Sequence, residues 1–121
     1  MAFRFRNFEV SVNSRKFINK VYEITRKFPQ TEQFGLTAQL RRAALSIALN
    51  IAEGSDRGSD RDFNGFIQMA MGSVNEVVAA LDIALDNSYM DKTAYDSILA
   101  DAEIIIKQLS SLSRRLKSRL P

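Results

Sequence analysis

Apolar residues recur every three or four positions along most of the chain, which is the spacing of one face of an α-helix. Four stretches carry this pattern, at about residues 8–28, 36–53, 59–87 and 91–119. The connections between them are short, and short connections make successive helices antiparallel neighbours. The sequence therefore predicts one all-α domain over residues 1–121, an antiparallel up-down-up-down four-helix bundle.

Polar residues before the apolar stretches predict where the helices begin. Ser59 is followed three residues later by Asp62, the spacing of a capping box, and Asp91 is placed to cap the last helix. The start of the second helix has two candidate caps, Thr31 and Thr37. The starts of the third and fourth helices are therefore each assigned to a single residue.

The first residues do not follow the helical spacing. Phe3 and Phe5 alternate with Arg4 and Arg6, which predicts a short extended N-terminal arm. Aromatic rings between arginines can stack on nucleic-acid bases, or they can dock on a neighbouring subunit. Both interpretations of the arm remain open at this stage.

The second helix is apolar on two sides. Five of its polar side chains fall within one stripe about 80° wide at 100° per residue: Gln39, Arg42, Ser46, Asn50 and Glu53. Leu45 and Leu49 lie on a flank away from the Leu36 and Ile47 stripe. A helix with this much apolar surface indicates a second contact, such as another subunit, or a central place in its own bundle.

Polar residues of the second and third helices are expected to meet when the chain folds back between them. Arg42 would come near Ser73 and Glu76, and Ser46 near Gln68, so that buried polar groups find partners. The whole cluster is Gln39, Arg42, Ser46, Asn50, Glu53, Gln68, Ser73 and Glu76. We interpret it as a structural cluster first and as a ligand site second.

Composition removes most catalytic chemistry. Apolar residues make up 45% and charged residues 26% of the chain, which is typical of folded soluble domains. The absence of both cysteine and histidine removes thiolate sites, the usual general base and ordinary transition-metal sites. We therefore expect no enzyme, no cofactor, no metal and no small-molecule substrate. No apolar run is long enough for a membrane span and no signal peptide is visible, so we expect a cytoplasmic protein without a membrane role.

The glycine-rich segment NIAEGSDRGSDRDF at 50–63 does not fit a known ligand loop. It lacks the lysine of a phosphate-binding loop, and the glycine and glutamate of a calcium loop are missing from their positions. We expect Gly54 to cap the second helix, Gly58 to form a turn and Ser59 to start the third helix.

Charge is distributed unevenly along the chain. Residues 1–42 carry nine basic and three acidic side chains, residues 43–106 carry three basic and eleven acidic ones, and residues 107–121 carry five basic ones. The predicted topology brings both termini and the 54–58 connection to one end of the bundle. The candidate nucleic-acid-binding residues at this end are Arg4, Arg6, Arg57, Arg61, Arg114, Arg115, Lys117 and Arg119. Basic residues at the end of the last helix would also complement its dipole.

Several motifs are specific enough to compare with a family. They are LTAQLRRAA at 36–44, NIAEG at 50–54, RGS at 57–59, and Gly72-Ser73 followed by Asn75-Glu76. In these motifs the sequence resembles the four-helix-bundle proteins encoded in intervening sequences of 23S rRNA genes, often called ribosomal-protein-like. It departs from their pattern at Ser11, where tryptophan is frequent, and at Ala48, where proline is frequent.

The resemblance implies a ring, as a homopentamer, and a role with RNA. The architecture is also similar to that of the accessory proteins of diversity-generating retroelements, which act with a reverse transcriptase and nucleic acid. We therefore expect a non-catalytic homo-oligomer that binds RNA or DNA through phosphate contacts. The alternative is a protein-interaction scaffold with no nucleic-acid role.

Overall fold

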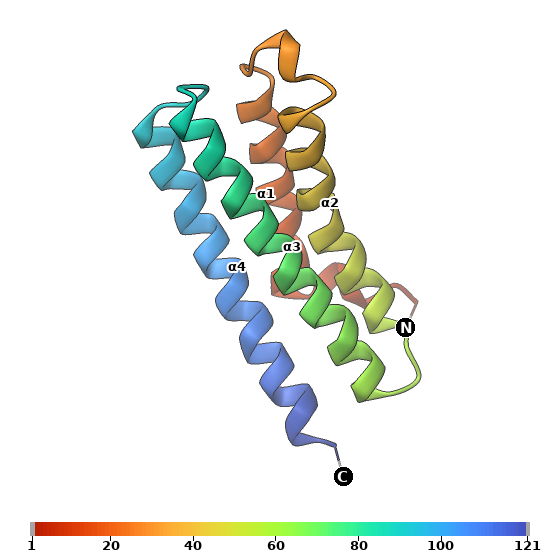
Figure 1. Ribbon diagram of the computed structural model, residues 1–121. Helices are drawn as coiled ribbons and strands as arrows, with labels where there is room; N and C mark the ends of the chain where they lie inside the picture. Colours follow the sequence, from red (N-terminus) through yellow and green to blue (C-terminus); the bar gives the residue numbers. More distant parts are fainter. Residues whose placement is uncertain (1, 121) are drawn as a thin grey trace.

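The computed structural model describes residues 2–120, and four long helices account for most of them. They are α1 (Glu9–Thr25), α2 (Leu36–Ser55), α3 (Asp60–Asp86) and α4 (Lys92–Ser118), with short 3₁₀ helices η1 (Arg4–Asn7) and η2 (Gln30–Glu32). The long helices lie side by side in a bundle (Figure 1). Their ends lie within three residues of the predicted ends. The all-α fold class is confirmed.

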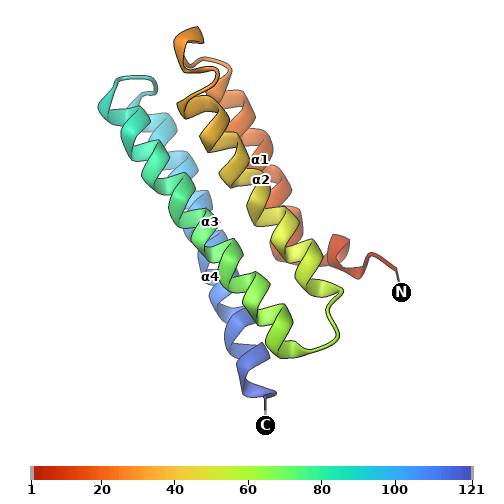
Figure 2. The same cartoon turned by 45° about the vertical axis from the view of Figure 1, so that its right-hand side comes forward.

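The chain reverses its direction at each connection, as both views show (Figure 1, Figure 2). Hydrogen bonds between α1 and α4 agree with this course. Asn13 pairs with Gln108 and Lys20 with Asp101, so residue numbers rise along one helix as they fall along the other. The first and last helices are therefore antiparallel neighbours.

The predicted apolar stripes form one continuous core between the helices. Its largest fully buried side chains are Phe17, Leu40, Ile47, Ile51, Ile67, Leu81, Ile98, Ile105, Leu109 and Leu116. Every long helix contributes to this set, so each is held by burial of its apolar face. The α2 helix continues without interruption past Ala48, because alanine keeps the amide that proline would remove.

Two of the predicted helix starts are confirmed. The Ser59 hydroxyl accepts a hydrogen bond from the backbone N–H of Asp62 at 3.1 Å, and Asp91 accepts one from Ala94 at 2.8 Å. At the start of α2 neither candidate threonine is the cap. Glu32 reaches forward instead, and its carboxylate accepts a hydrogen bond from the backbone N–H of Leu36 at 3.1 Å.

The structure corrects two sequence expectations near the lower end of the bundle in Figure 1. The N-terminal arm is not extended, because Arg4–Asn7 form the 3₁₀ helix η1, with Phe3 in the left-handed region at φ 57°. Gly54 is not a helix cap. It lies inside α2, where a Cβ would come within 2.7 Å of the Phe66 Cβ, so its small size permits close packing of α2 on α3.

The α3 helix has more apolar surface than the core covers. By length and composition alone it is the one helix within residues 2–120 that could cross a membrane, a test that core helices of soluble proteins also pass. Only 33% of its most apolar window is buried. Its exposed apolar side chains therefore need an explanation beyond this chain's own core.

Candidate functional site

One end of the bundle gathers basic side chains from four elements. Arg4 on η1 donates a hydrogen bond from Nη2 to the Ser55 carbonyl oxygen at 3.0 Å, which joins the arm to the end of α2. Arg119 after α4 forms an ion pair with Asp60 at the start of α3, at 3.0 Å. We call this surface the basic end. The eight predicted residues lie on these elements or directly beside them, with Arg57 in the connection between α2 and α3 and Arg119 directly after α4: Arg4, Arg6, Arg57, Arg61, Arg114, Arg115, Lys117 and Arg119.

Three of these eight basic residues already have partners within the chain. Arg57 forms an ion pair with Glu53 at 2.6 Å, and its guanidinium lies 4.5 Å from the centre of the Phe66 ring. Arg119 is paired with Asp60, and Arg4 is held by the carbonyl of Ser55. These side chains hold the arm and the helix ends in place.

The other five cations are exposed, and their side chains make no hydrogen bond or ion pair within residues 2–120. They are Arg6, Arg61, Arg114, Arg115 and Lys117. An exposed cation without a partner keeps its full charge available to a phosphate, whereas a paired one must first break its ion pair. The free charge of the basic end therefore comes from these five.

The folded arm brings in a further arginine that the sequence prediction missed. Ala2, Phe3, Arg6, Asn7 and Arg15 together line a hollow of about 300 Å³, which we call the Phe3–Arg15 hollow. Arg15 lies on the exposed side of α1 and has no partner within the described chain. In an extended arm Arg6 would lie away from α1. The η1 turn instead places Arg6 near Arg15 of α1.

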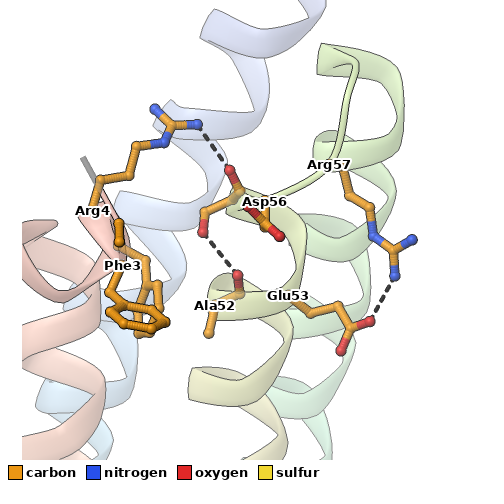
Figure 3. Close-up of a pocket in the computed structure, with 9 residues that line it drawn as sticks. Phe3, Arg4, Ala52, Glu53, Asp56 and Arg57 are labelled. Atoms are coloured by element: carbon orange, nitrogen blue, oxygen red, sulfur yellow. Dashed lines mark hydrogen bonds and ion pairs between the residues drawn. The ribbon is translucent and has the colours of Figure 1, made fainter.

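Phe3 also lines a second and larger hollow. This hollow measures about 650 Å³ and is lined by Ala2, Phe3, Arg4, Phe5, Ala52, Glu53, Ser55, Asp56 and Arg57; we call it the Phe3–Arg57 hollow. In Figure 3 the Arg4 side chain reaches from the arm to the end of α2, whereas the Glu53 and Arg57 side chains point away from the arm and meet each other. Two acids and two bases share this hollow, so it has no net charge to attract an anion.

The predicted polar cluster forms only in part. Ser73 donates a hydrogen bond to Ser46 at 2.9 Å, and the Asn50 amide donates to the Ser46 carbonyl at 2.8 Å. The expected Arg42–Glu76 pair is absent among residues 2–120, and both side chains are exposed. Arg42 and Glu76 are therefore two charges without a partner within residues 2–120.

Two more members of the predicted cluster have other surroundings. Gln68 does not reach Ser46. It donates to the Ser113 hydroxyl of α4 at 2.8 Å, and that hydroxyl in turn donates to Asn64 at 2.6 Å. Gln39 is exposed. The sequence prediction took Gln68 to face α2, although it lies on the α4 side of α3.

Exposed apolar side chains on α2 and α3 form a separate surface. Leu45 and Leu49 of α2 are 38% and 65% exposed, and Met69 and Ile83 of α3 are 57% and 51% exposed. Gly72 lies between the last two along α3, with open space where a Cβ would be. We call these five residues, with Arg42 and Glu76, the α2–α3 face.

The opposite end of the bundle is tied together by Glu32. Its carboxylate accepts hydrogen bonds from the Leu36 amide and, at 2.9 Å, from the Tyr89 hydroxyl. These bonds, with the amide the larger cause, hold the pKa of Glu32 below its ordinary 4.5. The same contact raises the pKa of Tyr89. Glu32 thus fixes the start of α2 and joins two connections.

The described residues offer no site for a metal. No group of three or more histidine, cysteine, aspartate or glutamate side chains within residues 2–120 is arranged to hold one. The main features of this molecule are a helical bundle, a basic end with five unpaired cations among its described residues, and an exposed apolar face on α2 and α3.

The fold and the basic end define a small helical-bundle protein, and comparison with known proteins identifies its family. The family model described as 23S rRNA-intervening sequence protein matches residues 6–111. The chain therefore belongs to the 23S rRNA-intervening sequence protein family.

A solved structure supports the same assignment. It is the crystal structure of a protein with unknown function from the S23 ribosomal protein family of Bacteroides thetaiotaomicron VPI-5482, with 26% sequence identity and a TM-score of 0.80. The similarity covers 86% of this chain and 97% of that one. None of the curated proteins compared with this chain matches it.

Proposed function

We propose that this protein is a non-catalytic, cytoplasmic homo-oligomer that binds RNA through phosphate contacts at its basic end. The observation that carries the proposal is the set of five exposed, unpaired cations gathered there from three elements. Phosphate contacts of this kind give affinity without sequence preference. Membership of a family named for an rRNA intervening sequence favours RNA as the partner.

Assembly is the second part of the proposal, and a second copy of this chain is the occupant we assign to the α2–α3 face. Leu45, Leu49, Met69 and Ile83 expose apolar surface that another subunit would remove from water. Arg42 and Glu76 lie on the same face without partners in the described part of the chain, and the Arg42 of one copy can pair with the Glu76 of the next. The family resemblance favours a closed ring of five.

Assembly would strengthen RNA binding without any new contact. Each subunit contributes one basic end, and a ring repeats that end around its axis. A strand that reaches two ends binds the second one at high effective concentration. Weak single contacts would then give useful affinity.

Light scattering of two matched variants tests the assembly. Leu49→Glu places a charge on the α2–α3 face, whereas Ile104→Glu places one on an α4 side chain of similar exposure, 52%, outside that face. We expect the first to lower the mass to that of one chain and the second to leave the oligomer intact. An unchanged mass for Leu49→Glu would refute the assigned face.

Fluorescence anisotropy with labelled RNA tests the binding. We expect binding near 50 mM salt that weakens steeply by 200 mM, because counterions released from phosphates drive it. Absence of binding at low salt would refute the proposal. Capture of an acidic protein that survives nuclease treatment would instead favour the protein-interaction scaffold.

A further inference from the structure

We infer that Phe3, Arg6 and Arg15 form a subsite for one unpaired nucleotide of a single strand, with the base stacked on Phe3 and a phosphate between the two arginines. The inference rests on the proposed RNA binding and narrows it to single-stranded segments. It follows from how η1 folds against α1 and the end of α2.

The Phe3 side chain is exposed to solvent, and its backbone has an unfavourable conformation. It is 69% exposed, and its backbone lies in the left-handed region at φ 57° and ψ 36°. A bulky residue in this region is strained, and such strain persists where the surroundings fix it. Here Arg4 fixes the arm through the Ser55 carbonyl and through its position 5.7 Å from the Phe8 ring. An exposed aromatic face at a fixed place is what base stacking requires.

The phosphate side of the subsite is defined by charge. The Phe3–Arg15 hollow is lined by two arginines and Asn7, and by no acid. Neither arginine has a partner within residues 2–120, so both forks of N–H donors are free for phosphate oxygens. The Phe3–Arg57 hollow, which Phe3 also lines, contains Glu53 and Asp56, which would repel a phosphate. Of the two hollows lined by Phe3, the Phe3–Arg15 hollow is therefore the one that accepts a phosphate.

Whether a base can stack on Phe3 depends on whether the nucleic acid is base-paired. Inside a duplex both faces of each base are stacked on neighbouring bases, so an exposed ring has no base face to contact. A single strand, loop or bulge presents free base faces to aromatic side chains. The subsite therefore predicts a preference for single strands that the other cations of the basic end would not produce by themselves.

A fluorescent reporter at the arm tests the stacking directly, because the natural chain contains no tryptophan. Phe3→Trp keeps an aromatic face and makes that position the only indole. Phe34→Trp is the matched control, since Phe34 is 90% exposed on the connection before α2, at the opposite end of the bundle. We expect single-stranded RNA to quench the first indole and not the second. Equal quenching, or none at the arm, would overturn the subsite.

Affinity measurements separate the two halves of the subsite. Phe3→Leu should weaken single-strand binding by about 5-fold to 100-fold, as loss of one stacked base does, and Phe3→Trp should restore it. Arg15→Gln should lower the salt slope by about 0.7, the share of one phosphate contact on a single strand. If base stacking on Phe3 gives the preference for single strands, duplex RNA should bind Phe3→Leu and Arg15→Gln nearly as tightly as it binds the natural protein.

The outcomes distinguish this inference from the proposed function. If the natural protein binds no RNA at low salt, the proposed function fails and the subsite fails with it. If it binds RNA but Phe3→Leu and Arg15→Gln bind equally well, or duplexes bind as tightly as single strands, only the subsite fails.

Discussion

Paired and unpaired cations of the basic end should contribute very differently to RNA binding. Each free cation that neutralises a phosphate of a single strand adds about 0.7 to the slope of log affinity against log salt. The basic end has five free cations, so the slope should reach about −3.5 per subunit if each contributes about 0.7. They are Arg6, Arg61, Arg114, Arg115 and Lys117. A fourfold rise in salt would weaken binding about 100-fold.

Two double variants separate the free cations from the paired ones. Arg114→Gln with Arg115→Gln removes two free charges, and should reduce the slope by about 1.4. Glu53→Gln with Arg57→Gln removes a complete ion pair of 2.6 Å and leaves the net charge unchanged. We expect this second variant to keep the natural slope. All four positions are exposed, so stability should change little in either case.

Anisotropy titrations of the same single-stranded RNA at a series of salt concentrations measure the slopes. Circular dichroism of each variant confirms that the helical content is unchanged. Equal slopes for the Arg114/Arg115 variant and the natural protein would refute the reasoning. So would a loss of slope in the Glu53/Arg57 variant, since that pair should have no free charge to offer.

Four further substitutions test the account of the fold by thermal or denaturant unfolding. Gly54→Ala should destabilise by about 1–3 kcal/mol through overpacking, whereas Gly58→Ala, in open space, should be neutral or slightly stabilising; equal effects would contradict the close approach. Ser11→Ala should stabilise by up to about 1 kcal/mol, because the buried Ser11 hydroxyl has no partner; a clear loss would show a missed hydrogen bond. Glu32→Gln should lower stability at neutral pH, where the charged carboxylate holds Leu36 and Tyr89. Since the folded pKa of Glu32 lies below 4.5, this difference should shrink as pH falls through that range, and a constant difference down to strong acid would argue against the ionised contact.

Helix positions could be predicted from the sequence because they depend on local spacing and local caps. Ser59 and Asp91 cap the amides of their own helices, so their role is visible within four residues of chain. The cap of α2 was missed because Glu32 acts across a turn that the sequence does not display. Gly54 was misread for a similar reason. Its size matters for Phe66, a contact that exists only when α3 lies against α2.

The location of the basic end followed from topology, but its division into free and paired charges did not. Arg119 and Asp60 are far apart in sequence, and only the packing of α4 on α3 brings them together. The arm was the largest error. Alternating Phe and Arg suggested an extended segment, whereas the 3₁₀ turn places Arg6 beside Arg15 and Phe3 in the lining of two hollows. Alternation over so few residues carries no cross-strand partner, so local turn hydrogen bonds decide the conformation.

Native mass spectrometry of the natural protein, with and without single-stranded RNA, tests the central claim most directly. We predict one homo-oligomeric species alone, and the same oligomer with RNA bound when the strand is added at low salt. A monomer that gains no RNA under these conditions would contradict both the assigned α2–α3 face and the role of the basic end.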